Sequence, residues 1–156
     1  MLRLKCFLWS GRLYRVTGSS MEPTLFTGDV VLVAKTGCDL DRGRLVIVRW
    51  PTVQGTDSTT ALIKRVVGLS GDVIEFDEGS LQINGKYYPE PYLSGLPQVL
   101  GVESGRWELR EGEMFLLGDN RAHSDDSRAY GPAPAETVEG TVEARVWPPS
   151  RWGGLP

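Results

Sequence analysis

Three short segments of the sequence combine residue types that can carry out nucleophilic chemistry. The first is VTGSSMEPTL, residues Val16–Leu25, in which two serines stand between a glycine and a proline. Gly18 can adopt backbone conformations that other residues avoid, and the ring of Pro23 fixes its φ angle. Ser20 could therefore be held at an exposed turn as a nucleophile, with backbone N–H groups directed at a developing oxyanion. An ordinary serine-rich turn is an equally good interpretation of this segment alone.

The second segment, ALIKRVVG at residues Ala61–Gly68, places two cations inside an apolar run. Burial disfavours the charged form of a lysine, and a lowered pKa is what a general base near neutral pH requires. Side chains alternate along a strand, so Lys64 and Arg65 point to opposite faces, and the pattern does not say which points inward. Taken alone, the strand fits better with two cations at a sheet edge whose charged ends reach solvent.

The third segment, GDNRAHSDDSR at residues Gly118–Arg128, follows an apolar run and is dense in hydrogen-bonding groups. Its mixture of acids, amide, hydroxyls and arginines predicts a cross-linked network rather than a run of repelling charges. A solvated acidic loop would have a similar composition.

The third segment also holds the only histidine, which opens a competing hypothesis. His123 and Ser20 could form a Ser-His-Asp set with one of the nearby aspartates. A lone histidine in an acidic loop is more often a surface residue. The aspartates in question are Asp119, Asp125 and Asp126.

Composition bounds the class of protein. The 156 residues fit one compact domain, and a net charge of -3 gives no reason to expect nucleic acid as a partner. Two cysteines, Cys6 and Cys38, form no metal or redox motif; one disulfide is possible, but unpaired thiols are favoured. With one histidine, a structural zinc site is not expected, and nothing indicates a metal or a cofactor.

The periodicity is that of strands, and the 19 glycines and 10 prolines favour many turns. Hairpin signals occur at Asp77–Gly79 and at Asn84–Gly85. Short strands at roughly ten-residue spacing predict an all-β sandwich or barrel. The expected strands are Asp29–Lys35, Arg44–Trp50, Ala61–Leu69, Asp72–Phe76, Ser80–Ile83, Trp107–Arg110, Glu113–Leu117 and Thr137–Trp147.

Three stretches do not have the pattern of strands. Thr52–Thr60 is polar and is expected to be an exposed loop, and Tyr87–Glu103 is rich in proline and aromatic residues. The latter predicts a long irregular excursion, which we place at about residues 87–106. The tail, Pro148–Pro156, is rich in Pro and Gly and is expected to fray.

Together the three chemical segments resemble the type I signal peptidase family. The resemblance rests on GSSMEPTL, on KRVVG, on GDNRAHSDDSRAYGP and, more weakly, on VEG and RVWP near the end, and it spans roughly residues 13–148. It implies a complex all-β fold of coiled antiparallel sheets with an inserted irregular or β region. It also implies a serine endopeptidase that cleaves signal peptides from exported pre-proteins through an acyl-enzyme.

The resemblance assigns roles to individual residues. Ser20 stands at the position of the nucleophile, Lys64 at that of the general base, and Ser124 at that of the serine that orients the lysine. Gly18 stands where some members carry a serine that assists the oxyanion, a glycine being typical of the Gram-positive-like branch, so the Ser20 backbone N–H would serve there. Met21, with the Leu62–Val66 face, is expected to line the substrate pockets. The supporting network would consist of Asp119, Asn120, Asp126 and Arg128.

The resemblance also implies a cell-membrane location with the catalytic domain on the extracytoplasmic side. Family members carry a membrane-spanning helix before the first motif, whereas here residues 1–12 are too few, and no long apolar run exists. A start assigned too far downstream, a trimmed chain and an unanchored member are the three explanations. Residues 13–148 would form the catalytic domain and 149–156 a tail, and Leu2–Trp9 could lie in the lipid interface.

Two alternatives to a signal peptidase remain at this stage. One is a maturation protease with the same Ser–Lys core and a single dedicated substrate. The other is a non-enzymatic β-barrel that binds peptides by strand addition, which leaves Ser20, Lys64 and Ser124 unexplained. The sequence predicts no oligomeric state.

Overall fold

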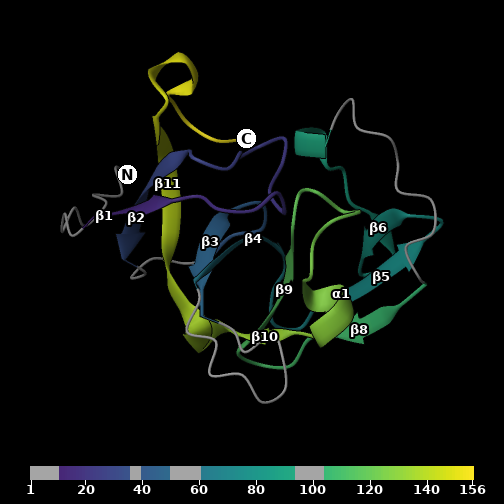
Figure 1. Cartoon of the computed structure of the whole chain (residues 1–156). Coiled ribbons are helices and arrows are strands. Elements are labelled where there is room, and N and C mark those ends of the chain that lie inside the picture. Colours follow the sequence, from purple (N-terminus) through teal and green to yellow (C-terminus); the bar gives the residue numbers. More distant parts are fainter. Residues whose placement is uncertain (1–10, 36–39, 50–60, 94–103) are drawn as a thin grey trace, which may run out of the picture.

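The chain folds into two antiparallel sheets (Figure 1), as seen in a computed structural model that describes residues 11–35, 40–49, 61–93 and 104–156. The larger sheet has the strand order β1-β2-β11-β3-β4-β9-β10, and the smaller has the order β7-β6-β5-β8. The all-β prediction is confirmed. The larger sheet consists of β1 (Arg12–Arg15), β2 (Val30–Lys35), β3 (Leu45–Val48), β4 (Leu62–Gly68), β9 (Glu113–Leu117), β10 (Ala133–Pro134) and β11 (Val138–Trp147). The smaller sheet consists of β5 (Val73–Asp77), β6 (Ser80–Ile83), β7 (Lys86–Tyr87) and β8 (Arg106–Glu108).

The helical elements are short. The single α-helix of the described residues, α1 (Ser127–Tyr130), lies beside β9, and three 3₁₀ turns cover Pro91–Leu93, Ala135–Thr137 and Pro149–Arg151. The sequence pattern finds the longer strands and both hairpin turns but misses the four-residue β1 and the two-residue β7 and β10. Such short strands carry too little alternation to be read.

Some expectations fall outside the described residues. They concern the loop at 52–60, the middle of the excursion at 94–103, the two cysteines Cys6 and Cys38, and the interfacial segment Leu2–Trp9.

Strand β11 joins the two halves of the larger sheet and runs along one side of the molecule in Figure 1. It pairs with β2 on one side and with β3 on the other, and its register shifts at several points. Shifts of this kind bend a strand and increase its twist. The larger sheet is therefore curled rather than flat, which agrees with the coiled sheets expected.

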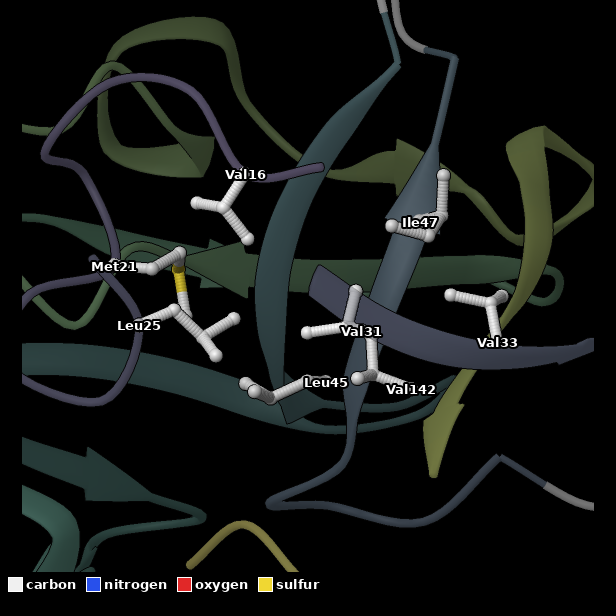
Figure 2. Packing of buried hydrophobic residues seen from close by; sticks show 8 residues of the cluster. All are labelled: Val16, Met21, Leu25, Val31, Val33, Leu45, Ile47 and Val142. Carbon is white, nitrogen blue, oxygen red and sulfur yellow. The ribbon is translucent and has the colours of Figure 1, made fainter. Parts of the chain in front are cut away.

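One apolar cluster anchors the loop between β1 and β2 on the larger sheet (Figure 2). Met21 and Leu25 are 2% and 0% exposed and pack with side chains of β2 and β3. Two hydrogen bonds shape the loop into turns, from Glu22 N to Ser19 O at 3.1 Å and from Leu25 N to Met21 O at 2.9 Å. The loop that carries Ser20 is thus fixed by burial of the residues that follow it. The cluster comprises Val16, Met21, Leu25, Val31, Val33, Leu45, Ile47 and Val142.

The C-terminal segment is tied down, so the expectation that it frays is wrong. Gly153 pairs with Arg145 through two backbone hydrogen bonds of 3.0 Å, and Leu155 packs against the same apolar cluster. Arg151 also pairs with the carboxylate of Asp29. Proline and glycine content predicts irregular backbone, but it does not reveal such anchoring contacts.

Candidate active site

Lys64 lies in a central strand and is almost completely buried, with 3% of its surface exposed. Its Nζ donates a hydrogen bond to Ser124 Oγ at 2.8 Å. Burial lowers the pKa of Lys64 below its ordinary value of 10.5, an effect opposed by the negative charges of Asp126 and Asp125. The interpretation of this strand as carrying cations that reach solvent is wrong, because Lys64 and Arg65 are only 3% and 0% exposed.

Arg65 is also buried, with 0% exposure, so both cations of the strand point into the protein. Its guanidinium donates to both carboxylate oxygens of Asp119, from Nε at 2.8 Å and from Nη2 at 2.7 Å. Nη1 donates to the carbonyls of Gly43 and Pro156, each at 2.7 Å. The buried charge of Arg65 is therefore paired with Asp119, whereas the Lys64 amine is hydrogen-bonded to Ser124.

The loop of Ser20 is bonded to the third chemical segment through Asn120. The backbone N–H of Asn120 donates to Ser20 O at 2.9 Å, and its side-chain Nδ2 donates to Ser19 O at 3.1 Å. These bonds fix the backbone on which the Ser20 hydroxyl stands.

Gly118 shows how closely the segments approach one another. A Cβ at this position would lie 2.1 Å from Ser124 Oγ and 2.6 Å from the carbonyl oxygen of Ser20. Only glycine fits there, because real Cβ contacts are never that short. Ser20 and Ser124 thus lie within a few ångström of one point, and Ser124 in turn contacts Lys64.

In the described part of the chain, Lys64 and Ser20 do not share a direct side-chain hydrogen bond. The Lys64 amine is bonded to Ser124 instead. In enzymes without substrate, catalytic hydrogen bonds are often long and tighten only when the substrate binds. The structure brings Lys64 and Ser124 into contact and places the Ser20 backbone close to Ser124.

Asp126 and Arg128 form a second charged pair, within the Gly118–Arg128 segment. Arg128 donates to Asp126 from Nε at 2.8 Å and from Nη2 at 2.9 Å, and Asp126 is fully buried. Asp126 also accepts from the backbone N–H of Gly118 at 3.0 Å and caps α1 through the Arg128 N–H. This carboxylate therefore connects both ends of the Gly118–Arg128 segment, and the network predicted there is present.

A small pocket opens beside Ser20, with a cavity volume of about 90 Å³. Gly18, in the left-handed region at φ 82°, and Met21 both line it, as does Leu62. Val66, expected on the same face, packs instead in a different apolar cluster. The lining residues are Tyr14, Arg15, Val16, Thr17, Gly18, Ser20, Met21, Ile47, Ala61, Leu62 and Ile63.

His123 is exposed, and its ring Nδ1 lies 3.3 Å from Asn120 Oδ1. Its backbone N–H donates to Asn120 O at 2.9 Å. Among the described residues, the imidazole has no hydrogen bond to Ser20 or to an aspartate, so the geometry of a Ser-His-Asp set is absent there.

Several residues that hold this site together were not singled out from the sequence. Glu90 pairs with Arg121, and Arg121 Nε donates to Gly118 O at 3.1 Å. The guanidinium of Arg65 stacks over the ring of Tyr92, with Arg65 Cζ 3.8 Å from the ring centroid. Both Glu90 and Tyr92 come from the excursion after β7, and no local pattern pairs them with partners so distant in sequence.

Comparisons with known proteins agree with this picture. A family model described as "Signal peptidase, peptidase S26" matches residues 1–147. "Signal peptidase I" of Bacillus caldolyticus is 36% identical, with 93% of this chain and 83% of that protein covered. "Probable signal peptidase I-2" of Synechocystis is 34% identical over 90% of this chain, which spans 65% of that relative's length.

A solved structure shows the same fold. The crystal structure of a signal peptidase I from Enterococcus faecalis V583 matches 67% of this chain and 97% of its own, with a TM-score of 0.57 and 27% identity. The fold and these matches define the class, a serine peptidase. More particularly, the chain belongs to the signal peptidase family, peptidase S26.

Proposed function

We propose that this peptidase removes signal peptides from pre-proteins with Ser20 as the nucleophile and Lys64 as the general base. The observation that carries the proposal is the buried Lys64 amine, bonded to Ser124 and set beside the Ser20 loop. A lysine with a lowered pKa is neutral, and able to accept a proton, at a lower pH than an ordinary lysine. The names of the relatives supply the substrate class, signal peptides.

The chemical steps follow from these positions. The Ser20 hydroxyl attacks the carbonyl carbon of the scissile bond while its proton passes to Lys64 Nζ. The backbone N–H of Ser20 is the donor we assign to the developing oxyanion, since Gly18 offers no side chain for that task. The protonated lysine then donates to the departing amine, leaving an acyl-enzyme. Lys64, neutral again, activates the water that hydrolyses the ester.

Substrate binding is proposed at the pocket beside Ser20. A volume of about 90 Å³ suits small side chains rather than large ones. β9 pairs with β4 from Arg65 onward, so in the described structure the edge of Leu62–Lys64 opposite β3 has no strand partner. An extended peptide can add to such an edge through main-chain hydrogen bonds, with alternate side chains entering the pocket.

Membrane association and the extracytoplasmic side are parts of the same proposal. The support is the relatives' activity, since signal peptides are presented where pre-proteins cross a membrane. Within the described residues, the structure contains no helix of the length and apolarity needed to span a bilayer. We propose that the lipid surface is a partner of this chain.

A cleavage assay with paired serine variants tests the proposal. The wild-type protein, in detergent, should cut a pre-protein at the end of its signal peptide, and Ser20→Ala should abolish cleavage. Ser19→Ala is the matched control, because Ser19 contacts Asn120 through its backbone carbonyl and should keep activity. Cleavage by Ser20→Ala at the wild-type rate would reject the nucleophile, and binding without cleavage by the wild type would favour a peptide-binding module.

A further inference from the structure

Among the described residues, one charged side chain lines the pocket beside Ser20. Of the described residues that line it, only Arg15 has a charged side chain, and the others are apolar, small or hydroxyl-bearing. Arg15 is the last residue of β1 and pairs through its backbone with Val30. Among the described residues, Arg15 is therefore the single cation in a lining of apolar and hydroxyl-bearing side chains.

The guanidinium of Arg15 forms no ion pair within the described structure. Its side chain is exposed, and no carboxylate of the described residues forms an ion pair with it. The arginines on the interior side differ: Arg65 is paired with Asp119, and Arg128 with Asp126. A guanidinium without an internal partner, set beside a substrate pocket, is available to a substrate carboxylate.

We propose that Arg15 is a specificity-determining residue that favours peptides with an aspartate or glutamate near the cleaved bond; this proposal rests on the substrate site assigned above. A substrate carboxylate within reach of the guanidinium forms an ion pair, and a lysine at the same position is repelled. Because Arg15 is solvent-exposed, the effect is modest. Exposed ion pairs of this kind correspond to about two- to fivefold in kcat/KM.

The test is a series of peptide substrates assayed in neutral detergent. Aspartate and its uncharged isostere asparagine are exchanged at each position on either side of the cleaved bond. The wild type should cleave the aspartate peptide about two- to fivefold faster, in kcat/KM, at one or two positions. Arg15→Gln should bring the ratio at those positions to about one, and Arg15→Glu should invert it. Arg12→Gln, on the same strand but outside the pocket lining, should keep the wild-type ratio.

Three results would overturn the proposal. One is an aspartate-to-asparagine ratio that is the same in wild type and Arg15→Gln at every position. Another is loss of cleavage of every peptide in Arg15→Gln, since Arg15 is given no part in the chemical steps. The last is an effect of Arg15→Gln seen only on anionic lipid vesicles and equal for both peptides, which would make Arg15 a headgroup contact. Cleavage by Ser20→Ala would instead refute the proposed function.

Discussion

Lys64 Nζ donates to Ser124 Oγ at 2.8 Å, across 60 residues of sequence. This bond orients the amine of a side chain that is otherwise flexible. A neutral amine that donates to Ser124 still has its lone pair to offer to the Ser20 hydroxyl. The second serine thus aims the base rather than reacting itself.

Ser124→Ala should therefore lower kcat by about 10- to 100-fold, a part of the roughly 100- to 10,000-fold that a general base contributes. KM should change little, because Ser124 does not line the pocket. Steady-state kinetics on a signal-peptide substrate checks the split. Ser80→Ala, on the separate smaller sheet, is a control of the same chemistry. A rise in KM with kcat unchanged would contradict the orienting role.

The pH dependence of cleavage should report Lys64. Because burial lowers its pKa below 10.5, activity should rise as pH increases through the lowered pKa and should already be present below pH 10.5. Lys64→Arg should be inactive at any accessible pH, since a guanidinium stays protonated and cannot act as a base. The measurement is kcat/KM across pH. An acidic limb that persists in an active Lys64→Ala variant would show that another group is the base.

Lys64 should also reduce stability, in a pH-dependent manner. Its folded-state pKa lies below its unfolded value, so between the two the unfolded chain binds more protons, and stability rises with pH. Lys64→Met should therefore be inactive, and its stability relative to wild type should be greatest at low pH and fall toward pH 10.5. Urea unfolding at several pH values measures this trend. The exposed Lys35→Met should show no such trend.

The ion pair between Glu90 and Arg121 should stabilise the Gly118–Arg128 segment. Their side chains are 12% and 8% exposed, and Arg121 also holds the carbonyl of Gly118. Glu90→Gln leaves a largely buried guanidinium without its counter-charge and should cost about 3 kcal/mol of unfolding free energy. Glu75→Gln, in an exposed pair with Arg106, should cost less than about 1 kcal/mol. Equal costs in urea unfolding would contradict the distinction.

The sequence predicts the longer strands of the fold, but it does not predict the burial and partners of the site residues. Longer strands such as β2 and β4 are evident from their apolar runs. The burial of both Lys64 and Arg65 could not be predicted, because alternation places the two side chains on opposite faces without indicating whether either face is buried. Which partner each cation takes depends on β9 and the segment after it, and these meet β4 only in the folded sheet.

The contacts behind the site could not be predicted at all. Tyr92 and Glu90 lie in a stretch whose proline content indicates only irregular structure. Their partners, Arg65 and Arg121, are 27 or more residues away, and no periodicity relates such positions. Gly118 carries a signal of another kind: glycine directly after an apolar strand marks a close approach, but not of which groups.

The most direct test of the central claim is to identify the residue that becomes acylated during turnover. The wild-type protein is mixed with a signal-peptide substrate, quenched with acid within a turnover, digested and analysed by mass spectrometry. The substrate's acyl mass is expected on the peptide that contains Ser20, with fragment ions placing it on Ser20 and not on Ser19. It should be absent from Ser20→Ala. An adduct on another residue, or one that survives in Ser20→Ala, would contradict the account.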